Sequence, residues 1–578
     1  MKRFATWIWV AVVCAGCTAS GAASGPGGGP DDGGAGADGV SDAVSTDGPR
    51  ADGVGDAPDA TSGPWRSELY PADWSPGHTG EDGRFLHDFS YAGYRNSEAK
   101  LGRAIPDRRF DVVEDFGGDP SGETPSTEAV RRAVDAAEKS GGVVFFPAGR
   151  YRITGRIRIE SSKVVLRGEG PEASRLFFPA NEEMSYASHL EFRGKLEHRT
   201  EWKLSEDAEN RSRRVTIEVD GKPLPEVGDD VAVGWVITEA FVRGHQMSEH
   251  WREFNGEWQP FFRREVEAVE REGETATVEL DVPLRYPAFR RDGASLRRTT
   301  GYIREVGVED LGLADAIGWD AAWKIDQTHV LEFHGVEDGW IRRVESFPSP
   351  AAPQSGPGSE DHLRSGGILI EESKRVTVAE SSMAEAQNRG GGGNGYLFEI
   401  RRSNEILTRD SVGRAGRHNF IQNWGFGTTG CVWLRVQSSG GVTMSSKGGS
   451  TASTGLSEFH HSLAMANLVD ASTLDDGWAA ENRKDYSSGA GHTATQSVFW
   501  NVTGTGRVRS YQYGWGYLIG VGSEIDVVVE IRDDLGDIGP LAKWENTEPR
   551  DWVEGRGRAG SLRPRSLFES QLERRLGR

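Results

Sequence analysis

Cysteine is nearly absent from this sequence: only three occur in 578 residues, which excludes a scaffold held together by disulfides. Basic residues are also outnumbered, with 67 Lys and Arg against 88 Asp and Glu and a formal net charge of −21. That balance excludes a general nucleic-acid binder, which needs a basic face. After the first residues, the sequence has no apolar run that reaches the ~20 residues needed to span a bilayer.

The first 17 residues have the pattern of an export signal. Lys2 and Arg3 make the start basic, residues 4–13 form an apolar run too short for a membrane helix, and residues 14–17 read Cys-Ala-Gly-Cys. Small residues before a cysteine resemble a bacterial lipobox, which implies cleavage before Cys17 and a lipid on its thiol. The sequence therefore predicts an exported lipoprotein, anchored in a membrane at the cell surface or in the periplasm. Ordinary signal-peptidase cleavage nearby is the alternative.

Residues 18–64 lack aromatic residues, leucine and isoleucine, and their only basic residue is Arg50. Glycine, alanine, aspartate, serine and proline dominate this stretch. Such a segment cannot bury enough apolar surface to offset its chain entropy. We therefore expect an acidic, disordered linker between the signal and the folded part.

Glycine is abundant, at 76 residues, and tryptophan occurs 18 times, which favours turns and short strands over a helical bundle. One helix is expected, with Thr124 as its N-cap and Pro125 at its first position. It ends at the glycine pair 141–142, and short β-rich runs follow it between residues 143 and 166. Its apolar stripe consists of Val130, Ala133, Val134 and Ala137.

The same stretch carries a resemblance to a known family. Asp-Phe-Gly-Gly at 115–118, the helix, Val-Val-Phe-Phe-Pro-Ala-Gly-Arg-Tyr at 143–151 and Val-Leu-Arg-Gly-Glu-Gly at 165–170 resemble the opening of pectate-lyase-superfamily proteins. That superfamily includes rhamnogalacturonase-like and polygalacturonase-like enzymes. The resemblance implies an all-β fold, a single-stranded right-handed parallel β-helix (a solenoid), with an N-terminal helix that caps the open end of the coil stack.

Loose repeats support a solenoid independently of the resemblance. Strand-like runs at 340–342, 376–378 and 406–408 are spaced by 36 and 30 residues, so residues 65–540 are expected to fold as one domain. Residues 195–300 interrupt the repeats and predict a β-rich insertion, which forms either the wall of a groove or a cover for one side. Residues 541–578 form a basic segment, and a short amphipathic helix at 566–576 is expected to pack on the end of the solenoid.

Polar and aromatic residues that suit catalysis concentrate in 417–501. If the coils are in register, His418, His461 and His492 should line up along one face. Arg-His-Asn-Phe at 417–420, His-His at 460–461, Asn-Arg at 482–483 and Gly-His at 491–492 are similar to motifs of a group of secreted bacterial β-helix proteins, which implies a shared fold and a candidate face. The candidate catalytic residues are Arg417, His418, His461, Arg483 and His492, and the candidate substrate-binding residues are Trp424, Asn423, Trp478 and Asn482.

These residue types favour an exported carbohydrate-active enzyme, a polysaccharide lyase that acts on a uronate-containing glycan. An arginine binds the uronate carboxylate, and an imidazole takes the neighbouring proton near neutral pH. A glycoside hydrolase of the same fold, which needs two carboxylates, and a non-catalytic glycan-binding or structural module are the alternatives. Polysaccharide and membrane are the expected partners, and nucleic acid is not. No metal or other cofactor is expected, with calcium at Asp475 and Asp476 as the alternative.

Overall fold

The computed structural model describes residues 63–252, 254–448, 452–531 and 547–578. The predicted signal peptide with Cys17, all but the last residues of the predicted linker, and residues 541–546 of the basic segment lie outside these ranges. Within the described ranges, none of the helices has the length and apolar character that a membrane crossing requires.

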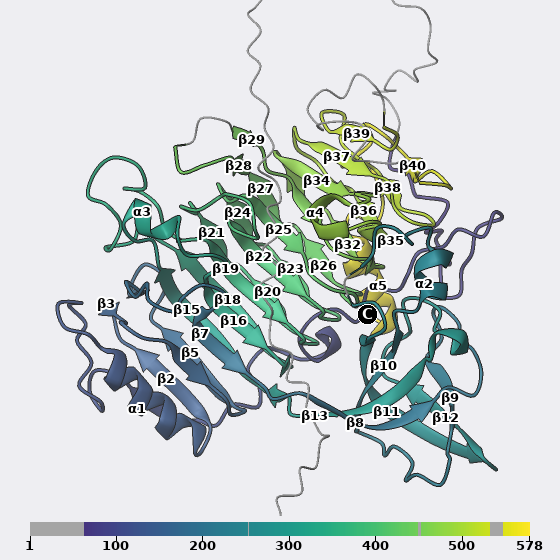
Figure 1. Ribbon diagram of the computed structural model, residues 1–578, viewed down its shortest axis with the longest axis horizontal. Helices are drawn as coiled ribbons and strands as arrows, with labels where there is room; N and C mark the ends of the chain where they lie inside the picture. Colours follow the sequence, from purple (N-terminus) through teal and green to yellow (C-terminus); the bar gives the residue numbers. More distant parts are fainter. Residues whose placement is uncertain (1–62, 253, 449–451, 532–546) are drawn as a thin grey trace, which may run out of the picture.

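A ten-stranded parallel sheet forms one side of the molecule (Figure 1). Its strands come from successive turns of the chain, which we call coils, and equivalent residues pair in register: Ile368 with Phe398, and Phe398 with Phe420. The strands are β4 (Ile157–Ile159), β7 (Ser188–Arg193), β16 (His329–His334), β19 (Gly366–Glu371), β22 (Tyr396–Arg401), β25 (His418–Gln422), β30 (Ser457–Phe459), β34 (Gly477–Ala480), β37 (Arg507–Ser510) and β39 (Asp526–Val528).

An 18-stranded parallel sheet supplies the other two sides, as two ladders that share the long strands β15 (Gly307–Ala314) and β18 (Trp340–Ser346). The first ladder adds β1 (Arg109–Asp111), β2 (Gly142–Phe146), β5 (Val164–Gly168), β20 (Thr377–Ala379), β23 (Leu407–Arg409), β26 (Val432–Leu434), β32 (Leu468–Asp470), β36 (Val498–Trp500), β38 (Tyr517–Ile519) and β40 (Trp552–Glu554). The second ladder adds β3 (Gly149–Arg152), β6 (Ser174–Phe177), β21 (Ser382–Ala384), β24 (Val412–Arg414), β27 (Gln437–Ser439) and β33 (Thr473–Leu474). The predicted right-handed parallel β-helix is thereby confirmed.

Short strand pairs and single-turn helices occupy the corners and loops between these sides. The parallel pairs are β14 (Ile303–Arg304) with β17 (Val336–Glu337) and β31 (Ala464–Met465) with β35 (Ala494–Thr495), and the antiparallel pair is β28 (Val442–Met444) with β29 (Ala452–Thr454). The short helices are η1 (Tyr94–Ser97), η2 (Arg290–Asp292), α3 (Trp319–Ala322) and α4 (Tyr486–Gly489).

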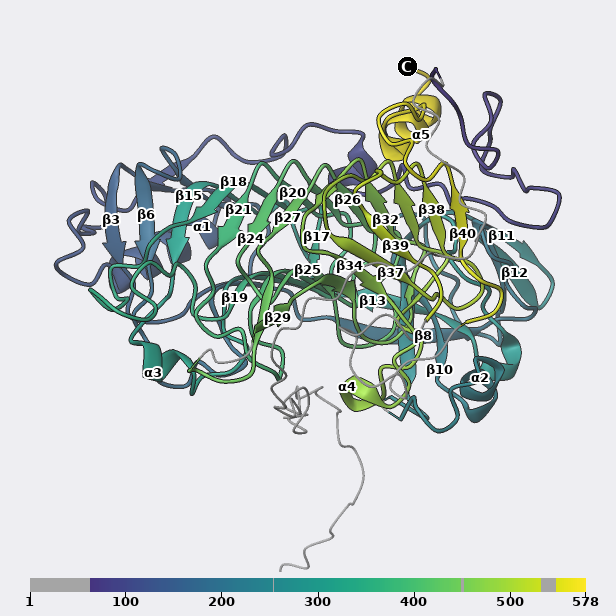
Figure 2. The same cartoon turned by 90° about the horizontal axis from the view of Figure 1, so that it is seen from above.

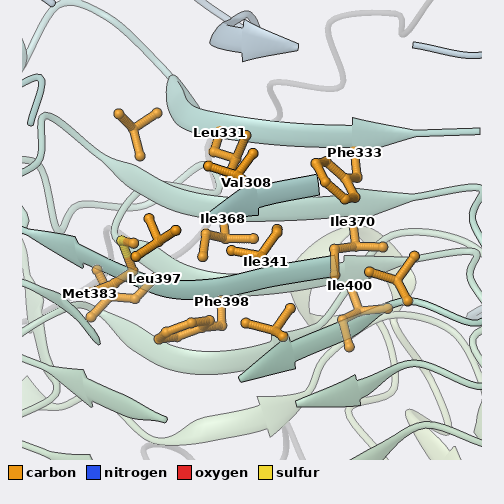
Figure 3. Close-up of a cluster of buried hydrophobic side chains, with 14 of the residues drawn as sticks. Val308, Leu331, Phe333, Ile341, Ile368, Ile370, Met383, Leu397, Phe398 and Ile400 are labelled. Carbon is orange, nitrogen blue, oxygen red and sulfur yellow. The ribbon is translucent and has the colours of Figure 1, made fainter. Parts of the chain in front are cut away.

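The interior of the coil stack is filled by alternate residues of each strand (Figure 3). Ile368 and Ile370 from one coil lie beside Phe398 and Ile400 from the next, and all four are at most 2% exposed. The Phe398 ring stacks on Phe420 of the following coil, with 5.0 Å between ring centroids. Each coil thus buries its apolar side chains only by stacking on its neighbours.

The helix α1 (Thr127–Glu138) covers the N-terminal end of this core, as predicted. Its buried face includes Val130 and Val134, which pack in the same cluster as the interior of the coils. The helix begins two residues later than expected, and Thr124 is not its N-cap. Thr124 instead donates hydrogen bonds to the Asp119 carboxylate from both its backbone N–H and its hydroxyl, which holds it in the turn before the helix.

The predicted insertion is a six-stranded antiparallel sheet with its own apolar core. Phe426, Leu463 and Met465 belong to that core, so the insertion packs against the corners of the coils that follow β25 and β30. Its elements are β8 (Glu197–Lys203), β9 (Arg214–Glu218), β10 (Asp230–Val236), α2 (Glu239–Gly244), β11 (Trp258–Glu272), β12 (Thr275–Leu280) and β13 (Ser295–Thr300).

The C-terminal helix α5 (Leu567–Arg575) lies across the flank of the first ladder (Figure 2). Leu567 and Phe568 pack in one cluster with Leu468, Val498 and Trp500 of successive coils. The prediction that this helix packs on the end of the solenoid is therefore wrong, because the outward side chains of this ladder are apolar and need a cover. The carboxylate of Asp470 anchors the helix by accepting hydrogen bonds from the Ser566 hydroxyl and two backbone N–H groups.

We predict that Phe398→Ala destabilises the domain by about 3–5 kcal/mol, because it removes a stacked ring and leaves a cavity between two coils. Thermal and denaturant unfolding of the purified protein measure this loss. Val227→Ala is the matched control, since Val227 is 69% exposed and its truncation should leave the midpoint unchanged. Equal midpoints for the two variants would contradict the packing of Phe398 between coils.

Candidate active site

The outer face of the ten-stranded sheet carries a cluster of buried, charged side chains. Between the inward residues, each strand directs the alternate residue outward, and register places these residues in a row. Glu399 of β22 pairs with Ile421 of β25, Ile421 pairs with Glu458 of β30, and Glu458 pairs with Ala479 of β34. Glu399 and Glu458 therefore lie two strands apart on the same row.

Glu458 is the centre of the cluster. Its Oε1 lies 3.1 Å from His418 Nε2 and 2.5 Å from His460 Nδ1, and its Oε2 lies 3.2 Å from Arg483 Nη1. The four side chains are each less than 10% exposed. Phe459 points into the core, so strand alternation directs Glu458 and His460 outward together. Arg483 arrives from the turn after β34, where its backbone N–H donates to Gly491 O.

The charges of this cluster shift its protonation equilibria in opposite directions. Burial alone would raise the pKa of Glu458, but His418, His460 and Arg483 hold it well below its usual range. Burial lowers the pKa of His418 to about 4, and the Glu458 charge offsets only part of this effect. At neutral pH the site therefore combines an ionised carboxylate with a neutral imidazole.

The position of the proton on His418 follows from its hydrogen bonds. Nδ1 lies against the backbone carbonyl of Leu456, and a carbonyl only accepts, so Nδ1 carries the proton of the neutral ring. Nε2 then carries the lone pair and faces Glu458 Oε1, a second acceptor, at 3.1 Å, and it has no hydrogen-bond donor among the described residues. A proton taken up by Nε2 would be stabilised by the adjacent carboxylate.

Tyr396 stands on the strand next to His418 and pairs with it in register. Its ring centroid lies 5.2 Å from that of His418 and 6.5 Å from that of His460. A phenol can give up a proton to a leaving oxygen, so the cluster includes a base, a carboxylate, a guanidinium and a proton donor.

A second carboxylate group lies towards the N-terminal coils. Glu399 accepts hydrogen bonds from His329 Nε2 at 2.9 Å, Arg401 Nε at 2.5 Å and Asn423 Nδ2 at 2.9 Å. Although burial alone would raise the pKa of Glu399, Arg401 and His329 lower it to about 2. Glu399 is therefore ionised throughout the neutral range.

The structure brings together only part of the site expected from the sequence. His418 and Arg483 meet at Glu458, and Arg417 precedes His418 and donates from Nη1 to Gly390 O. Asn423 belongs to the neighbouring Glu399 group.

The expectation that His418, His461 and His492 line up along one face is wrong. His461 Nε2 lies 2.9 Å from Ser487 O, and His492 Nε2 lies 3.1 Å from His245 O of the insertion. Burial lowers the pKa of each of these two histidines to about 3. Both lie in corners of unequal length beyond the strands, so equal spacing in sequence does not become equal position in space.

The three other predicted substrate-binding residues also lie outside the Glu458 cluster. Trp478 is fully buried in the core, 5.9 Å from Trp433 between ring centroids, and has no face open to a sugar. Trp424 packs between His461, at 4.6 Å, and Phe254 of the insertion. Asn482 forms a backbone bridge with His492 and accepts from Lys484 N.

Sequence reasoning missed Tyr396, Glu458 and His460 as site residues. The signal for two of them was present in Ser-Glu-Phe-His at 457–460, because an inward Phe459 requires outward neighbours on both sides. Choosing His461 instead of His460 ignored this alternation.

The aspartates named as calcium ligands have other partners in the structure. Asp475 Oδ1 accepts from Thr505 N, and Asp476 Oδ2 accepts from Asn419 Nδ2 and Gly441 N. A different set, Glu332, His334 and Glu371, has ligand atoms within 4.8 Å of one another and could hold a metal ion. Arg193 and Arg402 also contact the two carboxylates of that set.

Comparisons with known proteins extend these observations. Residues 110–200 match the family described as rhamnogalacturonase A/epimerase, pectate lyase-like. A segment of 56 residues is 38% identical to Alginate lyase 7 of Azotobacter vinelandii, which covers 10% of this chain and 6% of that protein.

Solved structures with a similar chain path have low sequence identity to this protein. The tailspike protein gp49 of Pseudomonas phage LKA1 is 13% identical with a TM-score of 0.45, over 72% of this chain and 64% of that one. The A-module of the Azotobacter vinelandii mannuronan C-5 epimerase AlgE4 is 11% identical with a TM-score of 0.29, over 73% and 96%. None of these likenesses assigns an activity to this chain. The family match at residues 110–200 and the strand pairings together identify the chain as a right-handed parallel β-helix protein with a pectate-lyase-like opening segment.

Proposed function

We propose that this protein is a polysaccharide lyase that cleaves a uronate-containing glycan on the outer face of the ten-stranded sheet. The observation that carries the proposal is the Glu458 cluster: a neutral His418 with its lone pair on Nε2, 3.1 Å from an ionised carboxylate and beside Arg483. Two histidines and an arginine within reach of one carboxylate support catalysis over passive binding.

The cluster contains the parts that β-elimination requires. In the proposed step, Arg483 neutralises the uronate carboxylate, which acidifies the C–H bond next to it. His418 Nε2, which is buried against Glu458 in the structure, must turn towards the substrate to take that proton, and Glu458 stabilises the imidazolium that forms. The electron pair of the C–H bond becomes the new carbon–carbon double bond, and the bond to the glycosidic oxygen breaks. Tyr396 supplies the proton that the departing oxygen needs.

A hydrolase is less well supported by the same geometry. Hydrolysis needs one carboxyl group that is protonated at working pH, and Glu399 and Glu458 have depressed pKa values. Burial raises the pKa of Glu481, which interacts with Glu458 and Arg483, but Arg509 Nε lies 2.9 Å from Glu481 Oε1 and favours its ionised form. Asp470 does have a pKa raised by burial to about 7, but it is enclosed beneath α5 on a different side of the coil. The Glu399 and Glu458 pair therefore lacks the protonated partner that hydrolysis requires.

We also propose that the protein is exported and tethered to a membrane through a lipid on Cys17. The basic start, the short apolar run and the Cys-Ala-Gly-Cys sequence support this proposal. An exported enzyme that is tethered to a membrane would meet polysaccharide outside the cytoplasm. Mass spectrometry of the mature N-terminus tests it: a diacylated Cys17 supports the tether, and an intact or unlipidated N-terminus contradicts it.

We predict that the protein generates the ultraviolet absorbance of unsaturated uronate from at least one of polygalacturonate, alginate or a glucuronate-containing glycan. His418→Ala should lower kcat/KM by about 10²–10⁴-fold, the usual loss when a general base is removed. His492→Gln is the control, because His492 contacts the insertion and not the Glu458 cluster. Equal losses in the two variants would contradict the assignment of His418, and reducing ends without absorbance would indicate hydrolysis.

The pH profile tests the base independently. Because the pKa of His418 is lowered to about 4, kcat/KM should stay level from pH 8 to about pH 6 and fall only as the pH drops through about 4. Glu458→Gln removes the charge that raises this pKa, so the acid limb should move to still lower pH while the plateau rate falls. An acid limb near pH 6.5, typical of an unperturbed histidine, would contradict this role for His418.

A further inference from the structure

A cleft lined by arginines lies on another side of the molecule, at the N-terminal coils next to α1. It consists of two adjoining hollows of about 340 and 550 Å³ that share Arg150 and Pro350. Beneath it, Phe177, Ala314 and Phe347 form one buried apolar cluster. The strands that carry it, β3 and β6, are far from β25 and β34, which carry the candidate active site (Figures 1 and 2).

Like charges occupy adjacent strands of this cleft. Arg150 of β3 and Arg175 of β6 pair in register, and neighbouring strands in a sheet are ~4.8 Å apart. Two cations placed directly opposite each other in a sheet repel. Phe347 lies 5.2 Å from the Arg175 guanidinium, which is a weak compensation for a missing counterion.

In the first ladder of the same sheet, by comparison, arginines on neighbouring strands are paired with a carboxylate. There Arg167 and Arg342 occupy strands on either side of Glu309, with Arg167 Nε 2.7 Å and Arg342 Nη2 3.7 Å from its carboxylate. In the cleft, by contrast, no carboxylate of the described residues lies within ion-pair distance of Arg150 or Arg175. Arg175 Nε is also buried without a hydrogen-bond partner.

The strand beside Arg175 carries no side chain at the position that pairs with it. That position is Gly312, where a Cβ would lie only 2.5 Å from Pro171 O and 2.9 Å from Arg175 Cγ. Close packing therefore requires glycine there, and no acidic side chain can stand opposite Arg175 on this strand. Arg152 adds a third guanidinium to the wall, and its only hydrogen-bond acceptor among the described residues is the backbone carbonyl of Glu123.

We propose that this cleft binds an anionic group of a glycan chain, a carboxylate or a sulfate ester, at a site separate from the candidate active site. An anion between Arg150 and Arg175 would remove their repulsion and accept hydrogen bonds from two guanidinium forks. That the anion belongs to a glycan rests on the proposed function, whereas the anion site itself rests only on the arginines. Binding at two distant sites would hold a long polymer more tightly than a short one.

The test measures affinity rather than activity, so it does not depend on lyase chemistry. Titration calorimetry at low salt should show that Arg150→Ala/Arg175→Ala binds polygalacturonate about tenfold or more weakly than the native protein. Arg343→Ala/Arg414→Ala is the matched control: it removes the same two charges from other strands of the same sheet, but Arg343 is already paired with Asp310 and Arg414 with Glu385. Equal affinities of the Arg150→Ala/Arg175→Ala variant and this control would overturn the proposal.

Two further measurements distinguish failure of the anion site from failure of the proposed function. Arg150→Glu changes an exposed side chain, so it should fold normally and weaken binding at least as much as the Arg150→Ala/Arg175→Ala variant. Dextran sulfate replaces polygalacturonate in a parallel titration. Arginine-dependent binding of dextran sulfate alone would support the anion site and assign it to sulfated glycans, even if no uronate lyase activity is found. If Arg150→Glu weakens the binding of neither polymer, the site is overturned.

Discussion

Stacking between coils is the constraint on which the rest of this structure depends. No coil can bury Phe398 or Ile370 by itself, so each strand must pair in register with the same strand of the next coil. The same register aligns the outward side chains of successive coils. Outward residues that are far apart in sequence, such as Glu399 and Glu458, become members of one row whose spacing is that of the strands.

The outward row on the ten-stranded sheet contains charged side chains that are buried, and protein stability alone does not explain why they are retained there. Removing water from Glu458 is costly, and the cost is offset only because three basic groups surround the carboxylate. The same lack of water keeps His418 neutral although it touches an anion. Neighbouring basic groups thus keep the acid ionised against desolvation, and desolvation keeps the base free, so that the two lie side by side.

The resemblance of residues 110–170 to the pectate-lyase superfamily implies the β-helix, loose repeats support it, and local patterns identify its individual elements. The helix before the glycine pair, the short β-rich runs and the β-rich insertion all follow from composition and alternation, because these patterns report which residues must be buried. The candidate site is harder to predict from the sequence than the fold. His418 and Arg483 were found, but His461 and His492 lie in corners whose path depends on the insertion, and Trp478 faces inward because of its place in the strand. Corner geometry depends on tertiary packing, which a single sequence does not encode in short motifs.

The flank beneath α5 has a consequence for how the chain reaches its native state. Phe89 and Gln571, which are hydrogen-bonded across a separation of 482 residues, close over outward-facing Leu468, Val498 and Trp500. Because β36 ends at Trp500 and α5 begins at Leu567, this part of the apolar strip is synthesised before α5 can cover it. The docking of α5 is therefore a late folding step. It brings the two ends of the domain into contact and covers an apolar surface that would otherwise be prone to self-association.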